Sequence, residues 1–204
     1  MHRRDHWERV YQTKGEQDVS WFESLPGISL EMLEASGLTR ETCVLDVGGG
    51  DSRLVDHLAA RGMDCLAVLD VSGAALQRAQ SRLGDAARVP VWIEADVTGD
   101  WRLKPMDIWH DRAVFHFLTM PEDQARYLEH LRAVLKVRGS AIIATFAPDG
   151  PEKCSGLPVA RYSPESLAKR LGPGFTLADS RRHVHQTPWG TPQSFQYSRF
   201  IRLH

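Results

Sequence analysis

The amino-acid sequence predicts a doubly wound α/β fold with a mostly parallel sheet. From Thr42 onward, short apolar runs alternate with helical patterns, which is typical of successive βα units. The apolar runs are continuous rather than alternating, as expected for strands that helices cover on both faces. After residue 172 the pattern changes to two β-rich segments joined by a turn, which predicts a closing antiparallel pair.

Five apolar runs give the predicted parallel strands, at 43–48, 65–71, 89–97, 107–118 and 140–147. Helical patterns connect most of them, at 52–62, 73–84 and 122–135, whereas residues 98–106 are turn-like. A Ser-Pro start and a glycine stop predict a further helix at 163–172, before the closing segments at 175–187 and 192–203.

The first 40 residues precede the predicted sheet. Residues 6–15 and 19–26 place aromatic side chains at helical spacing, and residues 28–37 form a plausible covering helix. A chain of 204 residues is within the usual range for one domain. We therefore expect a single domain, with residues 1–40 as a helical cover and residues 41–204 as the core.

Charge and composition exclude several classes of partner. The chain has 25 basic and 26 acidic side chains, so no electrostatic footprint for nucleic acid or an anionic membrane is visible. The first residues lack the apolar core of a secretory signal, and no run is long enough to span a bilayer. We expect a soluble, cytoplasmic protein that is a monomer or a weak homodimer.

The three cysteines, Cys43, Cys65 and Cys154, are odd in number and widely spaced, without metal-binding motifs. This spacing argues against a disulfide framework or a structural zinc, and we predict no metal site. Cys43 and Cys65 are in apolar runs, so we expect them in the core.

A loop of three glycines, Gly48, Gly49 and Gly50, joins the first predicted strand to the first helix. A dinucleotide fingerprint requires a third glycine where this chain has Arg53. A P-loop requires a Gly-Lys-Ser/Thr sequence that is absent here. What remains is a tight turn that lets the backbone approach a ligand, with Asp46 two residues before it.

Three predicted strands end near an aspartate: Asp46, Asp70 and Asp96. The carboxyl ends of parallel strands meet at one edge of the sheet, where ligands bind in this architecture. At the end of the second strand, such a carboxylate binds ribose hydroxyls. Each aspartate alone can serve as a loop cap, but the combination predicts a nucleoside-containing ligand.

This set of residues resembles the class I S-adenosylmethionine-dependent methyltransferases, from Val44 to the end of the chain. The resemblance implies a Rossmann-like methyltransferase fold, a seven-stranded sheet with a reversed last strand, and S-adenosylmethionine as cofactor. In that family the glycine loop packs against the methionine part, and the second and third strands supply acids for the ribose and near the adenine. Carried over, the cofactor residues are Asp46, Gly48, Gly49, Gly50, Asp70, Val71, Asp96, Val97 and Asp111. Ser52 replaces the last glycine of the usual G-x-G-x-G loop.

A narrower resemblance concerns the thiopurine and small-molecule thiol methyltransferases. Their D-R-G-A-like segment is matched by residues 111–114, with Ala113 in place of the glycine. Their Gly/Pro-rich loop is matched by residues 145–167, and their N-terminal tryptophans by Trp7 and Trp21. The resemblance implies a small soft acceptor, a thiol or sulfide, methylated by in-line displacement.

The segment after the fourth strand supplies the candidate catalytic residues, Arg112 and His116. Arg112 stays charged and can stabilise an anionic acceptor, although a salt bridge with a carboxylate explains it equally well. His116 titrates in the range useful for a base, although burial between Phe115 and Phe117 is an equally simple interpretation. Cys154 is in the loop over the predicted acceptor pocket. His183 and His185 share one strand face, which lines either the pocket or the solvent.

Three other functions remain as alternatives. The opening residues resemble small protein-lysine methyltransferases, but their acceptor motifs, D/N-P-P-Y or D-x-G-T, are absent after the fourth strand. A non-catalytic module that binds S-adenosylmethionine predicts binding without turnover. A nicotinamide-dependent reductase is disfavoured by Arg53.

Overall fold

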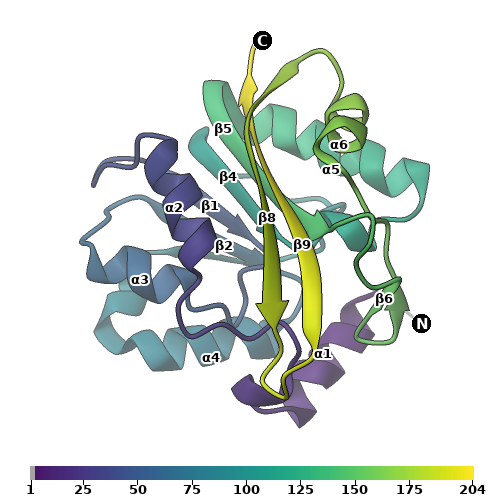
Figure 1. Ribbon diagram of the computed structural model, residues 1–204. Coiled ribbons are helices and arrows are strands. Elements are labelled where there is room, and N and C mark those ends of the chain that lie inside the picture. Colours follow the sequence, from purple (N-terminus) through teal and green to yellow (C-terminus); the bar gives the residue numbers. More distant parts are fainter. Residues whose placement is uncertain (1–2) are drawn as a thin grey trace.

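The computed structural model describes residues 3–204 and contains a seven-stranded sheet (Figure 1). The strand order is β3-β2-β1-β4-β5-β9-β8. The strands are β1 (Val44–Val47), β2 (Leu66–Asp70), β3 (Val91–Glu94), β4 (Met106–Arg112), β5 (Leu135–Phe146), β8 (Phe175–Gln186) and β9 (Pro192–Arg202). Neighbours from β3 to β5 are parallel, whereas β9 is antiparallel to β5 and to β8. The predicted mostly parallel sheet with a reversed last strand is therefore confirmed.

Helices connect the strands and cover both faces of the sheet. The α-helices are α1 (Arg3–Thr13), α2 (Gly27–Ala35), α3 (Leu54–Ala60), α4 (Gly73–Leu83), α5 (Pro121–Val134) and α6 (Pro164–Leu171). Short 3-10 turns are η1 (Glu16–Asp18), η2 (Gly84–Arg88) and η3 (Phe115–Phe117), and a small hairpin joins β6 (Lys153–Cys154) to β7 (Leu157–Pro158). Helix α6 begins at the predicted Ser-Pro signal, because the Ser163 hydroxyl accepts a hydrogen bond from the Ser166 backbone.

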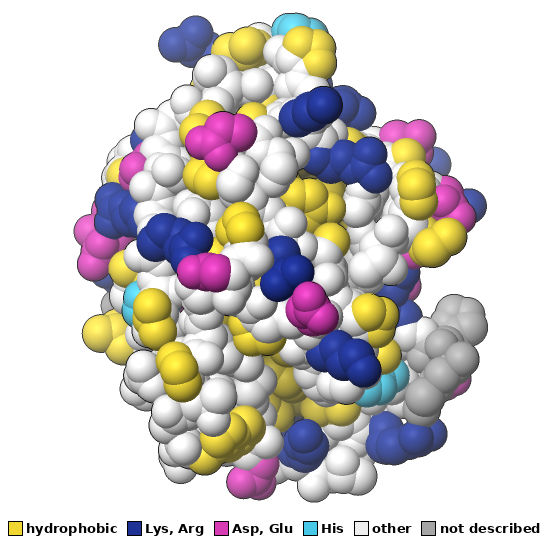
Figure 2. Space-filling view, turned by 45° about the vertical axis from the view of Figure 1, so that its right-hand side comes forward, with side chains coloured by type: hydrophobic (Ala, Val, Ile, Leu, Met, Phe, Trp, Pro, Cys, Tyr) yellow, Lys and Arg dark blue, Asp and Glu magenta, His cyan; other side chains and the backbone are white. Residues whose placement is uncertain are grey.

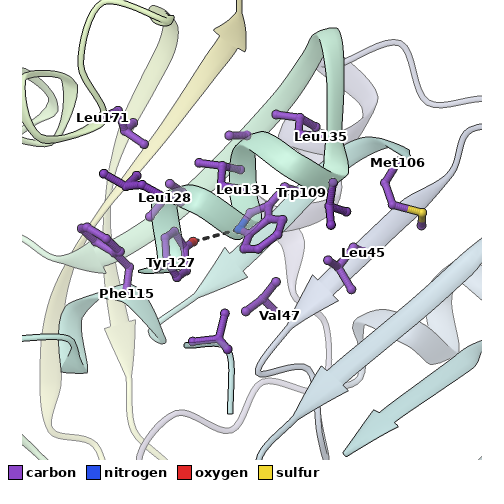
Figure 3. Close-up of a cluster of buried hydrophobic side chains, with 14 of the residues drawn as sticks. Leu45, Val47, Met106, Trp109, Phe115, Tyr127, Leu128, Leu131, Leu135 and Leu171 are labelled. Carbon is purple, nitrogen blue, oxygen red and sulfur yellow. Dashed lines mark hydrogen bonds between the residues drawn. The ribbon is translucent and has the colours of Figure 1, made fainter. Parts of the chain in front are cut away.

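The core has two layers because successive side chains of a strand point to opposite faces. On one face, Val44 and Ile108 pack against α2, α3 and α4. On the other, Leu45 and Trp109 pack against α5 and α6. Figure 3 shows this second layer, in which the Trp109 indole donates a hydrogen bond of 2.8 Å to the Tyr127 hydroxyl. Both indole and hydroxyl are fully buried and satisfied, so this layer is a rigid support for the end of β4.

The expectation of no disulfide was wrong for two of the cysteines, which are half-buried against the core. Cys43 and Cys65 form a disulfide bond with a Cα–Cα distance of 4.6 Å. Each precedes a strand, and β1 pairs with β2 in the register Val44 to Leu66. The two cysteines therefore face each other at the amino edge of the sheet, opposite the glycine loop. Spacing along the chain did not reveal this, because the pairing depends on the register of two parallel strands.

The charged side chains on the face in Figure 2 are of mixed sign. Lysine and arginine are scattered among acidic and hydrophobic side chains and form no single patch there. Within residues 3–204, no helix is both long and apolar enough to cross a bilayer.

Candidate active site

Two adjoining cavities lie at the carboxyl edge of the parallel strands. The first, here the wide cavity, is lined by α1, the ends of β2 to β4, the β6 loop and β9. The second, here the loop cavity, lies between the glycine loop and residues 11–29. They contain about 790 and 660 Å³ of space between the protein atoms, part of which is open solvent. Gly48 and Arg112 line both cavities, so the two spaces share one wall.

The glycine loop has no room for side chains. Gly48 has a φ of +67°, and a Cβ there would also collide with a methyl group of Val114. A Cβ on Gly49 would collide with the Asp46 carboxylate, and one on Gly50 would stand 2.5 Å from an Asp70 oxygen. The three glycines are therefore required for the backbone to pass directly over these two carboxylates.

Asp46 is the next-to-last residue of β1, and one of its carboxylate oxygens is bonded while the other has no partner. Its Oδ1 accepts a hydrogen bond of 2.7 Å from His110 Nδ1. Its Oδ2 is buried and has no hydrogen-bond partner among residues 3–204. A buried carboxylate oxygen of this kind is costly unless a donor meets it. The loop cavity, which Asp46 lines, is where such a donor can enter.

Asp70 ends β2 and lines the wide cavity together with Val71. The side chain is 6% exposed, and burial, helped by the nearby Asp46 charge, raises the pKa of Asp70 to about 7. Its Oδ1 accepts a hydrogen bond from the Ser72 backbone, which fixes the carboxylate at the start of α4.

Asp96 and Val97 also line the wide cavity, just after β3. The Asp96 carboxylate accepts hydrogen bonds from Arg3 at 2.9 and 3.0 Å. Arg3 also pairs with Asp123 at 2.6 Å and thereby ties α1 to α5. Figure 1 shows α1 at the lower edge of the sheet, beside the β6 segment. The N-terminal helix thus covers the carboxyl edge directly.

Asp111 is away from both cavities. Its Oδ2 accepts a hydrogen bond of 2.6 Å from the Tyr127 hydroxyl, and its oxygens also accept from the backbone of Val114 and Phe115. The fully buried carboxylate fixes the turn after β4, in which Ala113 has a φ of +71°. The resemblance implied direct cofactor contact for Asp111, but the geometry gives it a supporting position, because core and turn donors occupy its oxygens.

Arg112 crosses the wall between the cavities and is held by three neighbours. Its Nε donates to the Tyr197 hydroxyl at 3.0 Å and its Nη1 to the Trp21 carbonyl at 2.9 Å. Its Nη2 lies 3.0 Å from Glu23 Oε1, and its guanidinium lies 5.0 Å above the Phe195 ring. The salt-bridge interpretation thus applies, with Glu23 as the carboxylate, and the cation also faces the cavities.

His116 lines neither cavity. Its ring is fully buried against Phe117 and Phe146, and its Nδ1 accepts a long hydrogen bond of 3.4 Å from the Phe146 backbone. Burial and the Arg112 cation lower the pKa of His116 to about 3. The imidazole is therefore neutral and lies behind the cavity wall, which does not support its prediction as a base.

The wide cavity has an aromatic wall formed by α1, the η1–α2 segment, η3 and β9. Its members are Trp7, Tyr11, Trp21, Phe117 and Phe195. Trp7 contacts Tyr11, Trp21 and Phe117 with ring centroids 5.0 to 6.4 Å apart. Cys154 completes this wall, and burial raises the pKa of its thiol to about 11.

His183 and His185 do not line the cavities but gather around Glu23. Glu23 Oε1 lies 3.1 Å from His185 Nδ1 and 3.9 Å from His183 Nε2. The sequence predicted no metal site, yet these three side chains bring potential ligand atoms within 4.8 Å of one another. The same carboxylate oxygen already pairs with Arg112, a cation that opposes a metal ion there.

Several polar residues of the site were not predicted from the sequence. Ser29, Glu23 and Gln193 line the cavities, but each comes from a segment far from the glycine loop. His110 was visible in the fourth strand, but no role was predicted for it. Its two partners are 64 and 81 residues away in the sequence, so no local spacing could reveal them.

Known proteins are similar to this chain in sequence and in fold. Residues 45–141 match the family described as methyltransferase domain. EEF1A lysine methyltransferase 2 of Danio rerio is 24% identical over 190 residues, which cover 85% of this chain and 75% of the relative. The human protein of the same name is 24% identical over 192 residues, covering 86% and 75%.

Solved structures extend the likeness to nearly the whole chain. The 1,6-didemethyltoxoflavin-N1-methyltransferase of Burkholderia thailandensis, with bound S-adenosylhomocysteine, superposes with a TM-score of 0.75 at 19% identity, covering 98% of this chain and 87% of that one. A structure concerned with converting a disulfide bond into a thioacetal group during echinomycin biosynthesis gives 0.77 at 20% identity, covering 98% and 93%. With this fold, a matching family domain and methyltransferases among its relatives, the protein is a class I S-adenosylmethionine-dependent methyltransferase.

Proposed function

We propose that this methyltransferase transfers its methyl group to a small soft nucleophile, a thiol or sulfide, by in-line displacement. S-adenosylmethionine, when bound, supplies a methyl group activated by a positively charged sulfur. The observation that carries the proposal is the chemistry of the wide cavity: an aromatic wall, permanent cations at Arg112 and Arg3, and, among residues 3–204, no carboxylate besides the strand-end Asp70 and Asp96.

The residues at the strand ends fit the cofactor. The unpartnered Asp46 oxygen suits a cationic ammonium group, and Asp70 suits ribose hydroxyls. The glycine loop lets the backbone lie against the ligand between them. We assign Asp46, Asp70 and the loop to cofactor binding, with Val71, Asp96 and Val97 along the wide cavity.

Arg112 favours an anionic acceptor. A free thiol with a pKa of about 8.5 is a few per cent thiolate at neutral pH, and a nearby cation raises that fraction. The transfer then needs no base, which agrees with the position of His116 behind the wall. The aromatic side chains of α1 and η3 exclude water and hold the acceptor in line, so positioning provides most of the catalysis.

The second candidate is protein-lysine methylation. It is favoured by the likeness to EEF1A lysine methyltransferase 2 over most of the chain. An aromatic wall suits the aliphatic stem and ammonium of a lysine. Arg112 acts against this candidate, because a lysine enters as a cation and must lose a proton before it attacks.

A matched pair of acceptors tests the choice. 2-Mercaptoethanol and ethanolamine differ only in the nucleophilic atom, and release of S-adenosylhomocysteine reports turnover on each, beside sulfide, a carboxylate and a lysine peptide. We expect 2-mercaptoethanol to react at least roughly 100-fold faster than ethanolamine, because only the thiol supplies an anion near neutral pH. Faster turnover on the lysine peptide would overturn the proposal, and cofactor binding without turnover on any acceptor would favour a non-catalytic module.

A further inference from the structure

A buried chain of three polar side chains leads from α2 to the glycine loop. The Ser29 hydroxyl lies 2.9 Å from His110 Nε2, and His110 Nδ1 lies 2.7 Å from Asp46 Oδ1. Ser29, His110 and Asp46 are 1%, 2% and 4% exposed, and all three line the loop cavity. We infer that His110, held by Ser29, is a positioning residue that aims the free oxygen of Asp46 at the ammonium group of the cofactor.

The direction of the hydrogen bonds follows from the chemistry of the three groups. A carboxylate only accepts, so His110 Nδ1–H donates to Asp46. In the tautomer with the proton on Nδ1, Nε2 has a lone pair that accepts the hydroxyl proton of Ser29. Ser29 thereby fixes the tautomer and the ring plane of His110.

The order Ser-His-Asp is that of a hydrolase triad, but here the aspartate, and not the serine, has the atom without a partner. In this chain the serine hydroxyl is bonded to His110, whereas Asp46 Oδ2 has no hydrogen-bond partner among residues 3–204. Asp46 also lines the loop cavity, so a ligand there can supply the missing donor. The three residues are therefore arranged to present a carboxylate oxygen rather than a nucleophilic hydroxyl.

His110 also limits the ways in which Asp46 can move. A carboxylate bonded at one oxygen cannot rotate freely, and a side chain at Gly49 would collide with the other oxygen. Loss of the imidazole removes the only side-chain hydrogen bond to this carboxylate among residues 3–204. The oxygen then loses its fixed direction, and the charge-assisted contact with a cationic ligand weakens.

This inference depends on the proposed role of Asp46 but not on the acceptor. Its test is isothermal titration with two probes, S-adenosylhomocysteine and 5′-methylthioadenosine, which lacks the amino-acid part. The readout is the dissociation constant of 5′-methylthioadenosine divided by that of S-adenosylhomocysteine, since only S-adenosylhomocysteine has an ammonium group. A failed thiol assay leaves this measurement unaffected.

For His110→Ala we expect binding of S-adenosylhomocysteine to weaken roughly 10- to 100-fold, the range for a lost charge-assisted contact, while 5′-methylthioadenosine changes less than about threefold. His110→Asn, whose amide can still donate to Asp46, restores most of the ratio. Ser29→Ala lowers the ratio by a smaller factor, because the imidazole remains. His204→Ala, an exposed histidine that lines neither cavity, is the matched control and leaves both constants unchanged.

Two results would overturn the inference. Equal weakening of both probes means that His110 only supports the fold. Unchanged dissociation constants for both probes mean that Asp46 is aimed without His110. Thermal unfolding is recorded for each variant. His110→Asn and Ser29→Ala remove little volume, so they keep the test available if His110→Ala does not fold.

Discussion

At the glycine loop a buried carboxylate oxygen has neither a hydrogen-bond nor an ion-pair partner among residues 3–204, whereas each guanidinium nitrogen of Arg112 has a neighbour. Asp46, whose Oδ2 is this oxygen, lines the loop cavity, and the backbone passes over it without side chains. Arg112 is held by Tyr197, Trp21 and Glu23, and the rest of its surroundings are aromatic. The first region therefore selects a ligand by charge and hydrogen bonds. The second offers a fixed cation and an apolar wall, and it selects by shape and softness.

Substitution of Arg112 is expected to give the largest difference between the two regions. Arg112→Ala should lower kcat/KM for a thiol roughly 100-fold, the usual cost of removing a group that stabilises developing charge, while S-adenosylhomocysteine affinity changes less than about threefold. Arg112→Lys should lose less, because the charge remains without the fork of donors. Steady-state kinetics and isothermal titration separate the two effects. An equal loss of cofactor affinity would mean that the two regions are not distinct.

Gly48→Ala tests the region around the glycine loop. The substitution adds strain at a φ of +67° and a collision with Val114, so we expect S-adenosylhomocysteine to bind at least about tenfold more weakly. Gly62→Ala is the matched control, since Gly62 has a φ of +71° and open space around its Cβ position. Both variants should lose about 1 kcal/mol of stability from strain alone. Calorimetry showing equal affinity for both variants would remove the loop from the cofactor site.

The pH dependence of cofactor binding depends on Asp70. Burial raises the pKa of Asp70 to about 7, and hydroxyl donors favour its ionised form, so binding releases a proton below pH 7. Affinity for S-adenosylhomocysteine should rise about tenfold from pH 6 to pH 8 and then level off. The raised pKa also means that the unliganded fold loses stability as the pH rises through 7. Titration of Asp70→Asn should show a weaker, flat profile; a profile that still rises would assign the dependence to another group.

The smallest effect on the site is expected from the disulfide at the opposite edge of the sheet. Reducing Cys43–Cys65, or replacing both residues with serine, should lower the free energy of unfolding by roughly 2–3 kcal/mol, because the bond closes a loop of 22 residues. S-adenosylhomocysteine affinity should stay unchanged, since neither cysteine lines a cavity. Denaturant titration and calorimetry on the same samples check both statements. A large loss of affinity would show that the amino edge is coupled to the site.

The residues proposed to bind the cofactor were largely predictable from sequence because they lie at strand ends. Asp46, Asp70 and Asp96 lie near the ends of predicted strands, and parallel strands bring their ends together. The proposed acceptor region was not predictable in the same way. Its wall combines side chains as far apart in the sequence as Trp7 and Phe195, and no local pattern encodes that distance.

Two single residues show the limit more closely. His116 and His110 lie on one short segment, and His116 was predicted as the candidate base because an imidazole titrates in the useful range, with burial between Phe115 and Phe117 as the alternative. The fold buries His116 behind the wall and places His110 beside Asp46, since alternate residues of β4 face opposite layers and the strand ends before His116. The outcome depended on where β4 ends, which hydrophobic patterning locates only to within a few residues.

One competition measurement tests the central claim most directly. The protein receives S-adenosylmethionine with 2-mercaptoethanol and a lysine peptide in the same solution, and mass spectrometry counts the methyl groups on each. We predict methylation of the thiol, at least roughly 100-fold above the peptide, and its loss in Arg112→Ala. Preferential methylation of the peptide would contradict the account and assign the aromatic wall to a lysine side chain.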